Sequence, residues 1–404
     1  MKLMLVHPLF SEYGGAEKVL LDMFRTARKK YKTEMYTLFY KDYLKNEDNI
    51  FYGSLEEPKL KKIFGYKVNP FNKKAIKHLG KQLALRASKD DKIILTNFPA
   101  TLVLNEALKH NSELAEADTT FLSFEPDRIL YYEPLRNLDY IPEDIRSYKF
   151  QTYSKFLNRW RHIDWNIVRN RANRIITLSD YVTKQTKQIY KIKNTKTDLI
   201  MYVDTSNFKP ISKTRARTEL NKKYKLNLTN NDHVIFSIAR LVKSKGHDEL
   251  LNALNQLPKE ELQNTKVLIG GKGPLTKHLQ NRINKENLPV TLIGFVPDED
   301  LAKFYSCANT FITLPRKETG GPLTILEGIY ADNFIISTNE GGPPELITKR
   351  NGILVNPDNS KEIAQAILKA KKQKPRAKER RALINKKHSF KNYFKRFEKS
   401  LKLI

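Results

Sequence analysis

The alternation of short apolar runs with helical patterns is the feature that most constrains how this chain can fold. The runs have the length and β-branched content of buried strands, and helical patterns of about ten to fifteen residues separate most of them. This alternation is typical of parallel sheets covered by helices on both faces, so we expect an α/β fold. The expected strands are residues 3–7, 34–39, 93–96, 120–124, 174–179, 199–203, 233–239, 266–270, 290–294, 310–314, 334–338 and 352–356.

A long polar stretch, residues 204–232, divides the strand pattern into two halves. We expect residues 1–205 to form one Rossmann-like domain and residues 206–388 to form a second. Aromatic residues recur at helical spacing in residues 389–404, which predicts a closing helix that packs back on the first domain. Ligands of such sheets bind outside the carboxyl ends of the strands, so the two halves are expected to face each other across a cleft.

The chain is strongly basic, with 73 Lys and Arg residues against 44 acidic residues and a formal net charge of +29. Such an excess favours an anionic partner, although a generally lysine-rich surface would look the same. Residues 59–92 interleave cations with apolar side chains. This suits peripheral contact with an anionic membrane, and it suits equally a helix whose apolar side faces a core. No recognised nucleic-acid-binding module appears, so nucleic acid ranks last among the anions.

The single cysteine, Cys307, excludes an internal disulfide framework and points to a reducing compartment. The first residues have the pattern of a strand. They lack the pattern of a signal peptide, which is a charged start followed by an apolar core. No window of about eighteen residues is apolar throughout. We therefore expect neither a secretory signal nor a transmembrane helix, and predict a cytoplasmic protein.

Two loops after expected strands have the composition of anion sites. Gly14 and Gly15 lie where the first strand turns into a helix, although a plain tight turn is the simpler account of this pair alone. Arg240 and Lys245 follow a buried strand and precede a helix that begins near His247. Two cations beside a helix amino terminus suit a diphosphate, and the R-x4-K-G spacing favours this interpretation over two solvated charges.

A carboxylate, Glu327, stands in the middle of an apolar helical pattern that starts at Pro322. It falls on a stripe of small residues, where a carboxylate could accept hydrogen bonds from the two hydroxyls of a ribose. Hydrogen bonds from the N–H groups of a neighbouring loop account for it equally well. Asp298 and Asp300 have the spacing of a metal-binding pair, but they open a helix, so capping and dipole complementarity explain them more simply.

Taken together, these stretches resemble the family 4 retaining glycosyltransferases of GT-B fold, in which two Rossmann-like domains face each other across a cleft. The likeness runs over nearly the whole chain and is most specific in the second half. The segments that carry it are GGAEKVLLD, YVDTSNFKP, ARLVKSKGHDELLNAL, GGKGP, GFVPDEDLAKFYSCANTFITLP, GGPLTILEG, and NEGGPPELI with NGILV.

The resemblance implies a nucleotide diphosphate sugar donor, UDP- or GDP-linked, bound mainly by the second domain. Arg240 and Lys245 would hold the diphosphate, and Glu327 would hold the ribose hydroxyls. No metal or other cofactor is implied, because cations and helix termini stabilise the leaving diphosphate. The basic first domain suggests a lipid-linked glycan or other surface-glycan precursor as the acceptor. The remaining implied donor contacts are Gly14, Gly15, Gly320, Gly321, Leu323, Thr324, Gly294 and Val296.

Two departures from the family pattern concern the donor sugar. The family has a glutamate eight positions before Glu327, where this chain has Thr319, with Glu318 one residue earlier; a bulge at the glycine pair would let Glu318 take that role. The family also has a histidine before E-P-x-R, where this chain has Phe124. Other polar candidates for contacts with the donor sugar or acceptor are Glu125, Arg128 and His7.

Two other functions stay open for a chain of this pattern. One is another enzyme of the same fold, such as a nucleotide-sugar epimerase or a phosphorylase. The other is a sugar-nucleotide binder without catalytic activity, which Phe124 and the displaced Glu318 suggest.

Overall fold

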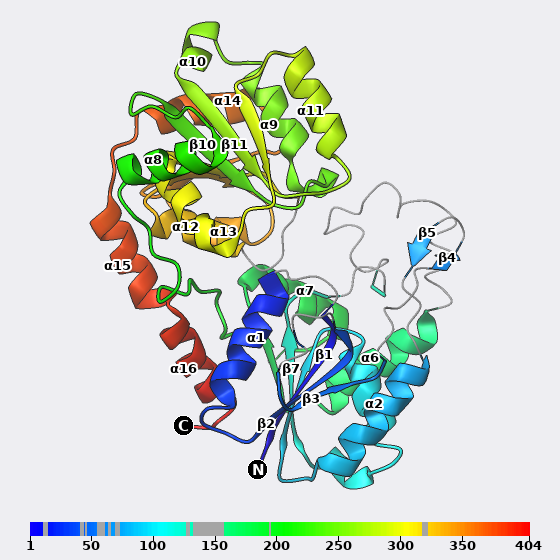
Figure 1. Cartoon of the computed structure of the whole chain (residues 1–404). Coiled ribbons are helices and arrows are strands. Elements are labelled where there is room, and N and C mark those ends of the chain that lie inside the picture. The colour runs from blue at the N-terminus through cyan, green and yellow to red at the C-terminus, as the bar shows by residue number, and fades with distance from the viewer. Residues whose placement is uncertain are drawn as a thin grey trace. The chain divides into compact units, whose positions relative to one another are not determined.

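The computed structural model describes the chain except for residues 11–14, 41–43, 45–46, 55–60, 64–65, 69–72, 127–129, 132–156, 194 and 317–321. The chain forms two compact units (Figure 1). Unit 1 comprises Met1–Leu199 together with Arg396–Ile404, and unit 2 comprises Ile200–Lys395. Among the predicted site residues, Gly14, Arg128, Glu318, Gly320 and Gly321 lie outside the described residues.

Unit 1 is built on a seven-stranded parallel sheet with the strand order β3-β2-β1-β6-β7-β8-β9. The first strand lies inside the sheet, with β2 and β3 on one side of it and β6 to β9 on the other, as in doubly wound folds. A separate antiparallel pair joins β4 (Lys61–Ile63) and β5 (Tyr66–Val68). The other strands are β1 (Leu3–Phe10), β2 (Thr33–Tyr40), β3 (Ile50–Tyr52), β6 (Lys92–Thr96), β7 (Asp118–Ser123), β8 (Arg174–Thr177) and β9 (Lys196–Thr197), and the helices are α1 (Gly15–Ala27), α2 (Lys73–Arg86), α3 (Ala100–Ala107), α6 (Asn158–Asn170) and α7 (Asp180–Tyr190).

Unit 2 has a six-stranded parallel sheet with the order β12-β11-β10-β13-β14-β15. Apolar side chains of its two faces are buried under helices, with α9, α11 and α14 on one face and α8, α12 and α13 on the other (Figure 1). The strands are β10 (His233–Ile238), β11 (Thr265–Gly270), β12 (Val290–Gly294), β13 (Thr310–Thr313), β14 (Phe334–Thr338) and β15 (Gly352–Val355), and the helices are α8 (Lys213–Tyr224), α9 (His247–Leu254), α10 (Lys259–Gln263), α11 (Thr276–Lys285), α12 (Asp298–Cys307), α13 (Leu323–Tyr330), α14 (Ser360–Lys371) and α15 (Ala377–Lys387).

The strand expected at residues 199–203 does not form, and that prediction is wrong. Its apolar side chains are buried, but Tyr202 packs against the rings of Phe390 and Tyr393 and not in a sheet. Val203 alone makes an isolated bridge, with Ser389. An apolar run can therefore be buried by aromatic side chains from a helix as well as by neighbouring strands.

Helix α2 lies within the basic stretch of residues 59–92. Its apolar residues Ile76, Leu79 and Leu83 belong to the core of unit 1. For this helix the structure favours the core-facing alternative, although Leu85 is 87% exposed. Among the helices of the described residues, none has both the length and the apolar character needed to cross a bilayer.

The last helix, α16 (Phe390–Ser400), begins in unit 2 and ends in unit 1. Its aromatic side is buried, with Phe397 only 1% exposed. Within unit 1, the buried carboxylate of Glu398 accepts hydrogen bonds from Lys30 Nζ at 3.0 Å and from the hydroxyl of Tyr31 at 2.8 Å. The final residues of the chain thereby complete unit 1.

Candidate functional site

The loop after β10 carries the two predicted diphosphate-binding cations. Arg240 is exposed, and Lys245 ends a short 3-10 turn, Lys243–Lys245, that leads through Gly246 into α9. The predicted helix start at His247 is confirmed. The His247 side chain is 2% exposed and hydrogen-bonds the backbone of Arg240, while burial lowers its pKa. The buried ring of His247 thus fixes the backbone of Arg240, whose side chain is exposed.

The loops after β10 and β13 touch through their backbones. Gly246 has a φ of +73°, and a Cβ atom there would lie 2.2 Å from the carbonyl oxygen of Leu314. Arg316 N donates to Ser244 O at 2.9 Å, and Arg316 Nη2 lies 2.8 Å from Glu249 Oε1. These contacts fix the start of the segment that continues through residues 317–321 to α13.

The loop after β11 approaches the same edge of the sheet. Gly271 has a φ of +123°, and a Cβ atom there would lie 1.9 Å from the carbonyl oxygen of Ala239. Gly271 N donates to Gly294 O at 2.7 Å, which ties this loop to the end of β12. Gly294 itself has a φ of +76°, and a Cβ atom there would meet nothing within 4 Å, while Val296, two residues later, is buried. Gly271 thus serves close backbone packing, whereas Gly294 does not.

Glu327 lies on α13 and is 8% exposed. The fully buried hydroxyl of Tyr305, on α12, is its neighbour. Burial, and then the negative charge of Glu327, raise the pKa of Tyr305 well above its usual value, although the hydroxyl has no acceptor within hydrogen-bond distance in the described part of the chain. Glu327 therefore lies beside a buried phenol, and a role in binding a ligand would be additional to this contact.

Gly328, one of the small residues on α13, packs against the sheet. A Cβ atom at Gly328 would lie 2.9 Å from Ile335 Cδ1 and 3.2 Å from Phe311 Cβ. The small residue therefore lets α13 approach the sheet, and not a ligand. Leu323 and Thr324 are the first residues of α13, follow Pro322 at the cap position, and are half-buried.

Asp298 and Asp300 lie in the first turn of α12, as expected, but neither caps it, because the cap position is Pro297. Asp300 is 1% exposed and accepts hydrogen bonds from Lys223 Nζ, from Tyr224 OH at 2.6 Å and from Lys303 Nζ at 3.1 Å. These donors lower the pKa of Asp300 to about 2, although its burial acts in the opposite direction. The carboxylate ties α8 to α12.

In unit 1, the described residues predicted to contact the donor sugar or the acceptor lie within or just after strands of the sheet. His7 is 5% exposed and its Nδ1 lies 2.7 Å from Thr96 Oγ1 on the adjacent β6. The side-chain oxygen of Asn97 accepts from the backbone N–H of Phe124 at 2.9 Å and of Glu125 at 3.4 Å. Phe124 is buried and Glu125 is exposed, while Gly15 is the exposed first residue of α1. His7 thus has a structural partner, and Glu125 is open to solvent.

Comparison with known proteins connects this geometry to a family. Residues 218–390 match the family described as Glycosyl transferases group 1. Over the whole length of both chains, the structure resembles that of Anabaena HepE in complex with UDP and glucose, with a TM-score of 0.72 and 16% identity. The chain therefore has the GT-B fold. The predicted fold is confirmed, and the assignment to family 4 stays a prediction.

Curated relatives of this GT-B chain match it over part of their length. Spore coat protein SA of Bacillus subtilis is 27% identical over 48% of this chain and 54% of its own. A GDP-mannose-dependent α-(1-6)-phosphatidylinositol monomannoside mannosyltransferase of Mycobacterium tuberculosis is 28% identical over 41% of this chain and 44% of its own. The chain spans about half the length of the curated relatives it matches.

Sequence reasoning missed the residues that hold the loops of the candidate site in place. Tyr305, Leu314 and Arg316 carry no motif of their own, because each acts on a segment distant in the chain. The buried His247 directly after K-G could have been noticed, since a histidine at the start of an apolar helix face needs a polar partner once it is buried.

We expect Gly246→Ala to displace the loop that carries Lys245. The added Cβ meets the Leu314 carbonyl oxygen and the backbone sits in the left-handed region, so the free energy of unfolding should fall by about 2 kcal/mol more than in Gly294→Ala. Gly294 is the matched control because its φ is similar but its Cβ would meet nothing within 4 Å. Urea unfolding measures both; equal losses would mean that contact with Leu314 does not constrain the loop.

Proposed function

We propose that this chain is a retaining glycosyltransferase that moves a sugar from a UDP- or GDP-linked donor to a hydroxyl group. The observation that carries the proposal is the convergence of loops at the carboxyl edge of the second sheet. There the cations Arg240 and Lys245 follow β10, and their loop packs by its backbone against the segment after β13, which leads to α13 and Glu327. Ligands of doubly wound sheets bind at this edge, where the strand order reverses.

The proposed roles follow from the charge and position of each group. Arg240 and Lys245 neutralise the diphosphate as it leaves, so that the bond to the sugar breaks without a metal ion. Glu327 accepts hydrogen bonds from the ribose hydroxyls, and the backbone N–H groups at the start of α13, at Leu323 and Thr324, face the distal phosphate and sugar. The acceptor hydroxyl attacks from the face that the diphosphate leaves, which retains the anomeric configuration and needs no nucleophile from the protein.

Other residues complete the proposed donor site. The UDP and glucose named for HepE and the GDP-mannose named for the mycobacterial relative support a nucleotide diphosphate sugar as donor. Gly294 and Val296 would lie against the base, and Gly14, Gly15, Gly320 and Gly321 against the phosphates. Glu318, Glu125, Arg128 and His7 remain candidates for contacts with the donor sugar or the acceptor.

We propose a lipid-linked glycan or other surface-glycan precursor as the acceptor, reached by peripheral contact at the cytoplasmic face of the membrane. The net charge of +29 and the lipid acceptors named for relatives support this. The apolar residues of α2 do not support it, because they lie in the core of unit 1. Failure to bind anionic liposomes at low salt would remove the membrane part of the proposal.

A second function, binding of a sugar nucleotide without transfer, is favoured by one observation. Phe124 is buried where related chains have a histidine, and a phenyl ring donates no hydrogen bond to a donor sugar. Binding of nucleotide sugars without any turnover in the presence of lipid-linked acceptors would support this alternative. Release of nucleotide that depends on the acceptor would exclude it.

We expect one class among UDP-, GDP- and ADP-sugars to raise the melting temperature of the protein, since a ligand at a hundredfold excess over its Kd adds about 2.7 kcal/mol of stability. Lys245→Ala should weaken this binding about tenfold, because it removes one charge-assisted contact. Lys243→Ala is the control, as it removes the same charge from the same 3-10 turn. No shift with any sugar nucleotide would overturn the proposed function.

A further inference from the structure

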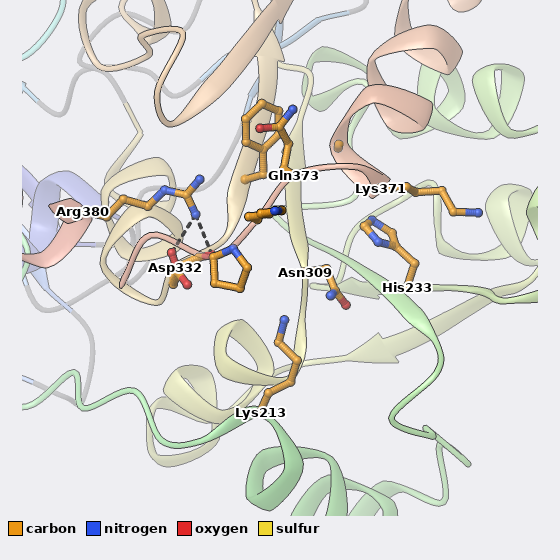
Figure 2. Close-up of a pocket in the computed structure, with 11 residues that line it drawn as sticks. Lys213, His233, Asn309, Asp332, Lys371, Gln373 and Arg380 are labelled. Carbon is orange, nitrogen blue, oxygen red and sulfur yellow. Dashed lines mark hydrogen bonds and ion pairs between the residues drawn. The ribbon is translucent and has the colours of Figure 1, made fainter. Parts of the chain in front are cut away.

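A polar cavity lies at the edge of the sheet of unit 2 where the strands begin. His233 is the first residue of β10, Phe334 the first of β14, and Asn309 directly precedes β13. The end of α14, the segment that follows it, and the starts of α8 and α15 surround the opening (Figure 2). The parallel strands run away from this edge, so the cavity is separate from the proposed donor site at their carboxyl ends.

The cavity is lined by an excess of cations. Lys213, Lys371, Lys374 and Arg380 border it, against the single carboxylate of Asp332. Asp332 is already engaged, because its Oδ1 accepts from Arg380 Nη1 at 2.8 Å and from Arg376 N at 2.9 Å. Positive charge therefore remains to be neutralised at this opening.

Two hydrogen-bond donor groups of the lining are unused within the described part of the chain. Lys213 makes no ion pair or hydrogen bond there, although it extends from α8 toward the side of the cavity that Asn309 lines (Figure 2). Arg380 is 4% exposed, and its Nε is buried without an acceptor. Lys371, by contrast, is held by the carboxylate and backbone oxygen of Glu261. Buried donors without acceptors are costly, and an anion would supply acceptors.

His233 responds to this positive charge. Its pKa is lowered to about 4, first by burial and then by Lys371, Lys213 and Arg217, while Glu261 acts weakly in the opposite direction. Its Nε2 lies 2.9 Å from Thr310 Oγ1. The neutral ring therefore sits beside several cations, and its environment should change when an anion enters.

The size of the cavity limits the ligand. Its volume of about 60 Å³ is several times the roughly 10–15 Å³ that one water molecule needs, which suits a phosphate group but not a nucleotide. We propose that this cavity binds a small tetrahedral oxyanion of the phosphate class, with Lys213, Lys374 and Arg380 as its cationic contacts. The oxyanion would be either free phosphate or the terminal group of a phosphomonoester.

The histidine resonances of the full chain provide a local test at pH 7. Sodium phosphate is titrated against sodium chloride of equal ionic strength, and the Cε1–H signal of His233 is identified by its loss in His233→Gln. We expect this signal to shift with saturation, and Lys213→Gln to weaken the binding about tenfold or more, because a charge-assisted contact is lost. Lys222→Gln, an exposed lysine of the same helix, should bind as the wild type does.

Three further results decide the proposal. Lys245→Ala must leave the His233 shift unchanged, since otherwise the phosphate acts from the proposed donor site. Methyl phosphate replaces inorganic phosphate in a second titration, and a shift with it as well would show that the cavity accepts a phosphomonoester end. No shift of the His233 signal with either probe, or equal weakening in Lys213→Gln and Lys222→Gln, would overturn the site without affecting the proposed transfer of sugar.

Discussion

Replacement of Glu327 by glutamine should weaken binding of the sugar nucleotide about a hundredfold, because hydrogen bonds to a charged group contribute about 1.5–3 kcal/mol each. Glutamine keeps the volume of the side chain. It loses the negative charge, and its amide nitrogen would face one of the ribose hydroxyls, which it cannot serve as an acceptor. Calorimetric titration with the donor found in the stability screen measures the effect.

Tyr305→Phe separates the two possible roles of Glu327. It removes the buried phenol that neighbours Glu327 and leaves the carboxylate in place. We expect donor affinity to stay within a few-fold of the wild type, because the hydroxyl that is removed has no hydrogen-bond acceptor within the described residues. If Glu327→Gln instead bound the donor normally and only lost stability, the carboxylate would serve Tyr305 alone and its proposed ribose role would be wrong.

Replacement of Asp164 by alanine should lower the free energy of unfolding of unit 1 by about 3–5 kcal/mol, because three buried hydroxyls lose their acceptor at about 1–3 kcal/mol each before relaxation. Asp164 lies on α6 and is fully buried. Its carboxylate accepts from Thr101 at 2.5 Å, Tyr131 at 2.6 Å and Tyr190 at 2.8 Å. Urea unfolding followed by tyrosine fluorescence reports the loss.

Asp164→Asn provides the control and a test of pH dependence. Burial raises the pKa of Asp164 above the ordinary value of 3.8, although the three hydroxyl groups act in the opposite direction. The folded protein therefore holds this proton more tightly than the unfolded chain, and the wild type loses stability relative to Asp164→Asn as the pH rises above 3.8, until the folded carboxyl has ionised. A difference between the two proteins that stays constant with pH would contradict the raised pKa.

Much of the fold could be predicted because parallel strands buried on both faces leave a strong pattern. The strands at 233–239 and 334–338 form within a residue of their expected ends, and α13 begins one residue after the expected Pro322. The run at 199–203 has the same composition but no neighbouring strand. Composition reports that a segment is buried, and not what covers it.

The candidate site was predictable only where a motif is continuous in sequence. Arg240, Lys245 and the start of α9 follow one another, so their arrangement could be inferred from spacing. The phenol beside Glu327 comes from another helix, and the close contact of Gly246 with Leu314 depends on which strands are neighbours. The cationic cavity is lined by side chains from α8, β10, α14 and α15, and no local sequence pattern predicts it.

The discontinuity of unit 1 has a consequence for how the protein is made. During synthesis the amino-terminal part of a chain emerges first, at about 5–20 residues per second, and domains usually fold as they appear. Here Glu398, which Lys30 and Tyr31 require as their buried acceptor, is added only after the whole of unit 2 has been translated. The unit that leaves the ribosome first is therefore the last to be completed, and a stalled or truncated chain would carry a finished second unit beside an unfinished first one.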